Sequence, residues 1–214
     1  MKLVLVRHGR PDEDERDRPH DPPLRADGHA QAEAVAARLA HEGITRIVSS
    51  PMARAAQTAR PLAERLGLPI EIVDGWAEAD RHVERYRSTE TLRALGDVEW
   101  GRFLADPIAY FGGDAATFRT GVLAAFATTM DNAGAPHRRD AHVAVFAHGL
   151  PINVVLSHVL GLERIIHFAP GYGSMTRLRV LRSGAIGVVS VNERGHLPFE
   201  PRPPSTIDPH ANAH

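Results

Sequence analysis

The chain has 214 residues, of which 43% are hydrophobic and 24% are charged, and its formal net charge at pH 7 is -1. This length and composition allow one substantial core, and the balanced charge gives no sign of the large positive field that nucleic acid or an acidic membrane requires. The sequence contains no cysteine, which excludes disulfides, thiolate zinc sites and cysteine nucleophiles and leaves histidine as the expected nucleophile.

The first half of the chain predicts short buried strands that alternate with helices. Residues 3–6 are branched and apolar, which is typical of a strand buried on both faces. This run is too short for a signal peptide core or a membrane span, so we expect a cytoplasmic location. Asp27 is expected to cap the first helix and Gly43 to end it. The next elements are predicted as a strand over 44–48, a helix over 52–66 that Pro61 kinks or shortens and Gly67 ends, and a strand over 70–73.

The second half begins with a segment that has no clean period. Residues 74–113 mix charges with aromatic residues, which predicts an irregular, partly helical excursion that caps the substrate. Asp114 is expected to cap the next helix, and residues 197–214, rich in proline and histidine, are expected to form a disordered tail. The remaining elements are predicted as a helix through Met130, a loop over 132–141, a strand over 142–147, a helix from Pro151 to Leu160 that stops at Gly161, and a hairpin of residues 175–181 and 185–191.

These elements predict an α/β fold, a three-layer αβα sandwich with a mainly parallel central sheet and a C-terminal hairpin. Residues 1–196 are expected to form a single domain, in which residues 74–113 are the irregular excursion over the active site. Ligands of open α/β sheets bind at the carboxyl ends of the strands, so polar residues at those ends are candidates for a site.

Basic side chains follow three of the predicted strands at the point where each strand ends. Arg7 and His8 follow the first strand, Arg54 follows the second, and His148 follows the strand over 142–147. If these strands are parallel, the four side chains converge. Guanidinium groups bind phosphate through paired hydrogen bonds, and the first turn of the helix that carries Arg54 is expected to offer free backbone amides to an anion. The residues alone therefore predict an anion pocket beside an imidazole that can attack phosphorus.

Four sequence blocks resemble the signatures of the histidine phosphatase superfamily, in its phosphoglycerate mutase-like branch. They are VRHG at residues 6–9, which contains the RHG motif, DPPLRADGHAQA at 21–32, SSPMARAAQTA at 49–59 and AHG at 147–149. The resemblance implies a phosphoric monoester hydrolase that needs no metal and no cofactor. It makes His8 the nucleophile that becomes phosphorylated, and it makes Arg7, Arg54, His148 and Gly149 residues that bind the phosphate.

The resemblance also implies a proton donor shortly after the third strand. Glu78 stands where the family glutamate normally falls, within IEIVDGWAEADRHVE. The Gly-x-Trp-Glu-Gly pattern that often follows is absent, so Asp80 and Glu84 remain alternatives for the acid. Nearby arginines offer two interpretations, recognition of a second acidic group on the substrate or simple surface charge: Arg81, Arg85 and Arg87.

The function expected from these residues is hydrolysis of a phosphomonoester of a small metabolite through a covalent phosphohistidine on His8. A phosphoglycerate-mutase-type transfer is an alternative, but the glutamate and Trp-Asn that accompany the first motif in glycolytic mutases are missing, because Arg10, Pro11 and Asp12 follow RHG. A phosphohistidine protein phosphatase and a phosphate-binding sensor or adaptor also remain open. The expected partner is a phosphorylated small molecule, with no nucleic acid and no membrane, and a homodimer is an alternative by family analogy only.

Overall fold

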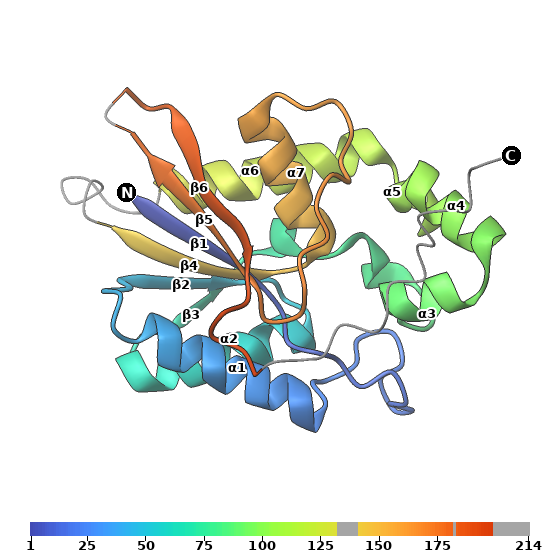
Figure 1. Ribbon diagram of the computed structural model, residues 1–214, viewed down its shortest axis with the longest axis horizontal. Coiled ribbons are helices and arrows are strands. Elements are labelled where there is room, and N and C mark those ends of the chain that lie inside the picture. Colours follow the sequence, from blue (N-terminus) through green and yellow to red (C-terminus); the bar gives the residue numbers. More distant parts are fainter. Residues whose placement is uncertain (132–140, 182, 199–214) are drawn as a thin grey trace, which may run out of the picture.

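The computed structural model describes residues 1–131, 141–181 and 183–198, and in these ranges six strands form one mixed sheet in the order β3-β2-β4-β1-β5-β6 (Figure 1). The strands β3, β2, β4 and β1 are parallel, and β5 and β6 continue the sheet as an antiparallel hairpin. The predicted α/β fold is therefore confirmed. The strands are β1 (Lys2–Arg7), β2 (Arg46–Ser49), β3 (Ile70–Ile72), β4 (His142–Ala147), β5 (Met175–Val180) and β6 (Ile186–Glu193).

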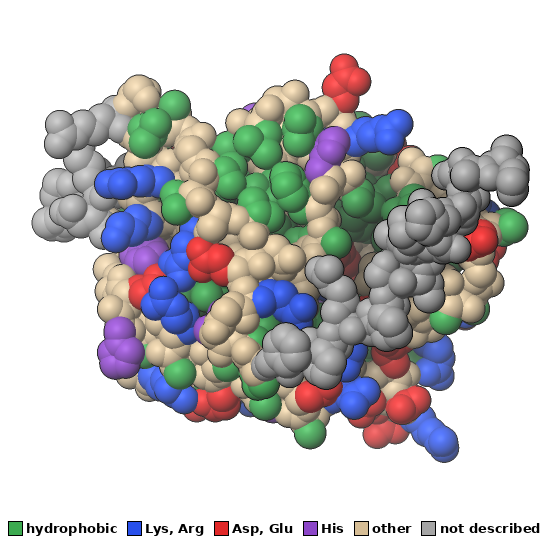
Figure 2. Space-filling model, viewed as in Figure 1, with side chains coloured by type: hydrophobic (Ala, Val, Ile, Leu, Met, Phe, Trp, Pro, Cys, Tyr) green, Lys and Arg blue, Asp and Glu red, His purple; other side chains and the backbone are tan. Residues whose placement is uncertain are grey.

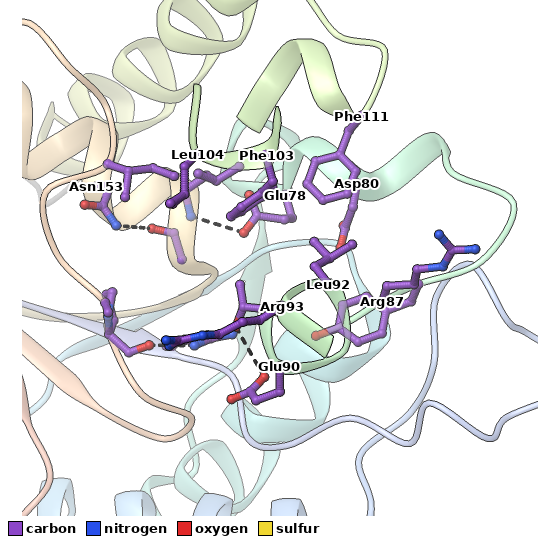
Figure 3. A pocket seen from close by; sticks show the side chains of 18 of the residues that line it. Glu78, Asp80, Arg87, Glu90, Leu92, Arg93, Phe103, Leu104, Phe111 and Asn153 are labelled. Atoms are coloured by element: carbon purple, nitrogen blue, oxygen red, sulfur yellow. Dashed lines mark hydrogen bonds between the residues drawn. The ribbon is translucent and has the colours of Figure 1, made fainter. Parts of the chain in front are cut away.

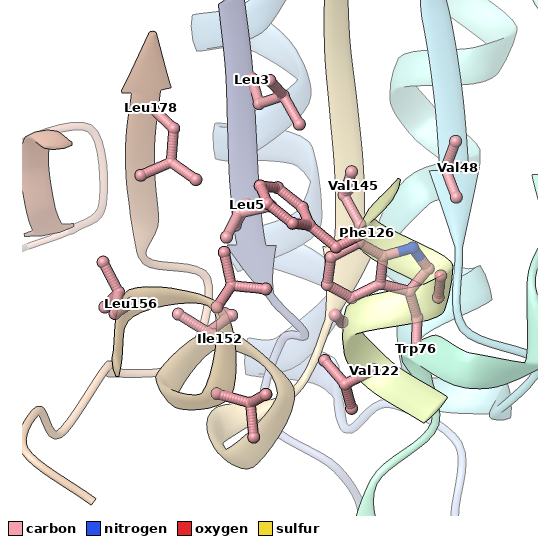
Figure 4. Packing of buried hydrophobic residues seen from close by; sticks show 14 of the residues in the cluster. Leu3, Leu5, Val48, Trp76, Val122, Phe126, Val145, Ile152, Leu156 and Leu178 are labelled. Carbon is pink, nitrogen blue, oxygen red and sulfur yellow. The ribbon is translucent and has the colours of Figure 1, made fainter. Parts of the chain in front are cut away.

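Helices cover both faces of the sheet, which gives the predicted three layers (Figure 1). The helices α1 (Ala26–Leu39) and α2 (Ala53–Leu66) pack on the face that carries Val4 and Val6. The helices α6 (Ala115–Asp131) and α7 (Gly149–Leu160) pack on the face that carries Leu3 and Leu5 (Figure 4). Successive side chains of a strand point to opposite faces, so the continuous apolar run of β1 contributes to both cores.

The predicted helix ends are partly wrong. The first helix begins before Asp27, with Arg25 at the N-cap position, and the Asp27 carboxylate accepts a hydrogen bond from the amide of the adjacent Gly28 instead of capping the helix. Gly43 has the expected left-handed backbone, but α1 already ends at Leu39. Pro61 does not shorten α2, which continues without interruption to Leu66. The proline lacks an amide hydrogen, so the helix loses one backbone hydrogen bond at this position.

Other predicted ends are confirmed. Gly67 and Gly161 end α2 and α7 in the left-handed conformation. Asp114 caps α6, because its carboxylate accepts a hydrogen bond of 2.8 Å from the amide of Thr117. The predicted loop over 132–141 lies outside the described residues except for Ala141, and residues 199–214 of the predicted tail lie outside them as well. In the described ranges no helix has the length and apolar character needed to cross a bilayer.

The excursion after β3 lies beyond the carboxyl ends of the parallel strands, where Figure 1 shows α3, α4 and α5 grouped at one side of the sheet. The loop after β1 is bonded to it, since Pro19 O accepts from the amide of Tyr86 at 2.7 Å and Glu13 accepts from Thr91 Oγ1 at 2.8 Å. These hydrogen bonds hold the excursion against the loop that follows β1. Its elements are two 3₁₀ turns over Asp74–Trp76 and Ala79–His82, then α3 (Thr89–Ala94), α4 (Asp97–Ala105) and α5 (Pro107–Tyr110).

A glycine contact at the start of α1 holds the loop that follows β1. A Cβ added at Gly28 would lie 2.1 Å from Arg10 O, and one added at Gly9 would lie 2.5 Å from Gly28 O. We expect Gly28→Ala to lower the free energy of unfolding by about 1–3 kcal/mol, because the loop must move. Gly121→Ala is the matched control, since its Cβ meets nothing within 4 Å and α6 should gain about 0.5–1 kcal/mol. Urea unfolding measures the stability of the two variants. A Gly28→Ala variant as stable as the wild type would contradict the prediction.

Candidate active site

The predicted polar residues meet at the carboxyl edge of the sheet. His8 directly follows β1 and its amide donates to Ala147 O at 3.0 Å, so the ends of β1 and β4 are joined at this point. The rings of His8 and His148 lie 5.0 Å apart between centroids. His8 lines a cavity of about 360 Å³, which is drawn in Figure 3. Predicted site residues that line this cavity are Arg7, His8, Arg54, Glu78 and Gly149.

His8 is oriented and held neutral. Its Nδ1 lies 2.7 Å from Gly9 O, so this nitrogen carries the proton and Nε2 keeps its lone pair. The amide of Gly9 donates in turn to Thr58 Oγ1 at 2.9 Å, which fixes the loop against α2. Burial, and then the positive charges of Arg54 and Arg7, lower the pKa of His8 well below its usual value. The ring is therefore a neutral imidazole at physiological pH, as a nucleophile must be.

Two guanidinium groups face the cavity with donors that have no acceptor. Arg54 is fully buried, and its Nη2 donates to Asp80 Oδ1 at 2.8 Å. Its Nε and Nη1 are buried and have no hydrogen-bond partner among the described residues, and Nη1 lies 3.8 Å from Asp21 Oδ1 in an ion pair. Arg7 Nε is also buried without a hydrogen-bond partner in the same ranges. Arg7 Nη1 donates to Pro170 O at 2.6 Å. Buried donors without acceptors cost free energy, so their concentration beside His8 is typical of a site for an anion.

Aromatic rings support both guanidinium groups. The guanidinium carbon of Arg7 lies 4.1 Å from the ring centroid of Tyr172, and that of Arg54 lies 4.7 Å from the ring of Tyr86. The hydroxyls of Tyr86 and Tyr172 lie 3.4 Å apart, so a hydrogen bond connects the two rings. Stacking on a ring restricts a guanidinium to one plane, and a planar group in a defined orientation binds phosphate through two parallel bonds.

His148 adds a further polar atom at the same place. The residue is fully buried, and its Nε2 lies 2.8 Å from Ser50 Oγ. The other ring nitrogen, Nδ1, is buried without a partner among the residues that the structure describes. Burial lowers the pKa of His148 well below its usual value, and the charges of Arg54, His8 and Arg7 lower it further. His148 is thus a neutral hydrogen-bonding group.

Glu78 has the properties of a group that exchanges protons at neutral pH. Its Oε2 accepts a hydrogen bond of 3.1 Å from the amide of Leu150 at the start of α7, and its Oε1 accepts one of 3.0 Å from Ala79 (Figure 3). Burial raises the pKa of Glu78 to about 7, and the negative charge of Asp80 adds to this effect. A carboxyl group of this pKa can donate a proton in one step and accept one in the next.

The alternative acids lie in different surroundings. Asp80 is buried, but both of its carboxylate oxygens accept from Arg54 Nη2, so it acts as a partner of that cation. Glu84 is exposed and does not line the cavity. Among the nearby arginines, Arg87 lines the cavity, whereas Arg81 lies 3.7 Å from Asp74 in an ion pair.

The expectation of free amides at the start of α2 is wrong for Ala53 and Ala55. The amide of Ala53 donates to the carboxylate of Asp21 at 2.9 Å, and the amide of Ala55 donates to Met52 O at 3.0 Å. The loop after β1 thus supplies a capping carboxylate, and Arg54 lines the cavity.

Three contributors to the site escaped the sequence analysis: Tyr86, Tyr172 and Asn153. Asn153 Oδ1 accepts from the amides of His167 and Phe168, and its Nδ2 donates to Gly149 O, so it ties the segment after α7 to the cavity (Figure 3). The signal for Asn153 was present, since it is the polar residue within the apolar run LPINVVL. The tyrosines gave no signal. Within the described residues, no group of three or more His, Asp or Glu side chains could hold a metal ion.

Known proteins resemble this chain over most of its length. The model of the family described as histidine phosphatase superfamily (branch 1) matches residues 3–193. The chain belongs to this family. A curated relative from Enterobacter sp. (strain 638), named a probable phosphoglycerate mutase, is 36% identical over 95 residues, which cover 43% of this chain and 44% of the relative. The chain thus matches less than half the length of this relative.

Solved structures of family members share the fold. A phosphoserine phosphatase from Entamoeba histolytica, in complex with 3-phosphoglyceric acid, superposes with a TM-score of 0.70 at 23% identity, and the match covers 92% of this chain and 98% of that one. A mycobacterial glucosyl-3-phosphoglycerate phosphatase, in complex with VO3, superposes with a TM-score of 0.71 at 23% identity over 90% of this chain and 99% of that one. At these identities the similarity shows the fold alone.

Proposed function

We propose that this protein is a phosphatase that hydrolyses phosphomonoesters through a covalent phosphohistidine on His8. The observation that carries the proposal is the set of buried nitrogen atoms that have no hydrogen-bond partner in the described part of the chain, which belong to Arg7, Arg54 and His148, beside the neutral imidazole of His8. The arginine donors, together with His148 in the tautomer that carries the proton on Nδ1, can bind the three equatorial oxygens of a phosphoryl group during transfer, which is the main catalytic contribution in such reactions. Membership of the histidine phosphatase superfamily supports the same reaction.

In the first step, His8 Nε2 attacks phosphorus and forms the N–P bond while the ester P–O bond breaks. The leaving alkoxide takes the proton of Glu78, which is available because the pKa of this carboxyl is about 7. The hydrogen bond from His8 Nδ1 to Gly9 O supports the positive charge that develops on the ring.

In the second step, the Glu78 carboxylate accepts a proton from a water molecule as its oxygen attacks phosphorus. The N–P bond breaks, inorganic phosphate leaves, and both His8 and Glu78 return to their initial protonation states. One carboxyl thus serves as acid and then as base.

A mutase is the second candidate, because the curated relatives that match part of this chain are named probable phosphoglycerate mutases. A mutase would use the same adduct and transfer the phosphoryl group to a second hydroxyl of the substrate instead of water. Incubation with 3-phosphoglycerate separates the two activities. A phosphatase releases inorganic phosphate, whereas a mutase yields 2-phosphoglycerate.

Trapping of the adduct tests the proposed function. Rapid acid-free quenching during turnover of a ³²P-labelled phosphomonoester should leave an acid-labile label on the peptide that contains His8, and the label should be absent in His8→Asn. His20→Asn is the control, since this histidine is exposed. Turnover without any label on His8 would overturn the mechanism. Binding of phosphate without turnover or label would identify a sensor instead of an enzyme.

A further inference from the structure

The cavity above the anion site is lined mainly by apolar side chains. Its wall includes residues of the excursion over 74–113 and residues of the segment that follows α7, and Figure 2 shows hydrophobic side chains gathered over α7 on the adjoining surface. The apolar residues that matter here are Leu92, Phe103, Leu104 and Phe111 from the first group and Ile166 and Phe168 from the second. A substrate that reaches the anion site must contact this wall.

The aromatic residues in the wall formed by the excursion pack against one another. Phe103 is buried and stacks on Trp100 with ring centroids 5.4 Å apart, and it contacts Phe111 edge-on at 5.9 Å. Both Leu92 and Leu104 line the cavity; Leu92 is buried within α3, whereas Leu104 is 46% exposed (Figure 3). Packed aromatic rings keep their positions, so the wall is a formed surface for an apolar ligand group.

Some of the charged groups of the cavity have partners within the protein. Asp80 pairs with Arg54, and Glu90 accepts a hydrogen bond from the Tyr172 hydroxyl at 3.3 Å. The guanidinium carbon of Arg93 lies 5.9 Å from the ring of Trp100. Arg87 and Arg93 are both exposed cations on the cavity wall. Along the apolar part of the wall, a polar group beside the ester oxygen would lose water and gain few partners.

We infer that the substrate is a phosphomonoester whose alcohol carries an apolar group, aliphatic or aromatic, next to the ester oxygen. The inference rests on the proposed function and adds the substrate class to it. The cavity volume of about 360 Å³ is near the lower limit for pockets that enclose a small organic ligand, so the apolar group is compact, of the size of a short chain or a small ring system.

A series of alkyl phosphates tests this inference, because ethanol, butanol and hexanol are leaving groups of nearly equal acidity. We expect kcat/KM to rise about threefold to fourfold for each methylene until the cavity is filled. Glycerol 3-phosphate should fall below butyl phosphate. Equal kcat/KM across the series, or a preference for glycerol 3-phosphate or 3-phosphoglycerate over hexyl phosphate, would overturn the inference.

Variants of the wall connect the preference to these residues. Leu104→Asn should lower the ratio of kcat/KM for hexyl over ethyl phosphate by about threefold to tenfold, and Phe168→Ser should lower it in the same direction from the other segment. Leu95→Asn is the matched control, since Leu95 is 50% exposed on the same excursion and does not line the cavity. A ratio unchanged in both folded wall variants would contradict the assignment of the wall.

The two proposals fail in different ways. Absence of phosphate release from every ester, together with absence of a label on His8, would remove the proposed function and the substrate class with it. Release from every ester at similar kcat/KM, with a label on His8, would remove the substrate class alone.

Discussion

Arg54→Met is expected to lower kcat/KM for any phosphomonoester by about 10³-fold or more, with folding retained at low temperature. Arginines that contact a phosphoryl group in transfer contribute on this order. Arg54 is fully buried and lines the cavity, and its Nε and Nη1 make no hydrogen bond among the described residues. Its loss therefore removes a positive charge and hydrogen-bond donors from the site. Steady-state kinetics with an aryl phosphate measure the effect. Arg65→Met on the same helix is the control, since Arg65 pairs with Glu33 at the surface.

The same substitution should destabilise the protein, because it leaves the carboxylate of Asp80 buried without its cation. Loss of one partner of a buried pair costs about 3–5 kcal/mol. The double variant Arg54→Met/Asp80→Asn should recover part of this free energy of unfolding and none of the activity. Recovery of activity in the double variant would mean that Arg54 only balances the charge of Asp80 and does not stabilise the transferred phosphoryl group.

Glu78→Gln is expected to lower kcat for an alkyl phosphate by about 10²-fold to 10⁴-fold, and to lower it less for 4-nitrophenyl phosphate, whose leaving group needs no proton. The acid form of Glu78 is required, so wild-type kcat/KM for the alkyl ester should fall as the pH rises through about 7. On the acid side, kcat/KM should fall only below the usual range of histidine, because the pKa of His8 is lowered.

The pH profile of the Glu78→Gln variant distinguishes an acid from a structural residue. The decline above about pH 7 should disappear in the variant, while the decline on the acid side should remain. Glu84→Gln, at an exposed position of the same segment, is the control and should keep the wild-type profile. A variant of Glu78 that retains the decline above pH 7 would show that another group supplies the proton.

Much of the architecture was predictable because it depends on local patterns. Apolar runs such as residues 3–6 and 142–147 are continuous, and continuous runs are typical of strands covered on both faces. Parallel strands bring their carboxyl ends to one edge, so Arg7, His8, Arg54 and His148 were expected to meet there, as they do. The error at the start of α2 arose because the carboxylate that bonds the Ala53 amide, Asp21, comes from a distant loop. The error at Asp27 arose because its carboxylate accepts from the adjacent Gly28 amide and no side chain caps α1.

The sequence by itself determined which residues stand at the strand ends and, through its motifs, which chemistry they suit. Only the tertiary structure decided that Glu78 has a pKa of about 7, that Asp80 pairs with Arg54, and that the cavity wall is apolar. These properties depend on burial and on distances between segments far apart in the chain. Desolvation and charge act through space, and spacing along the sequence does not encode them.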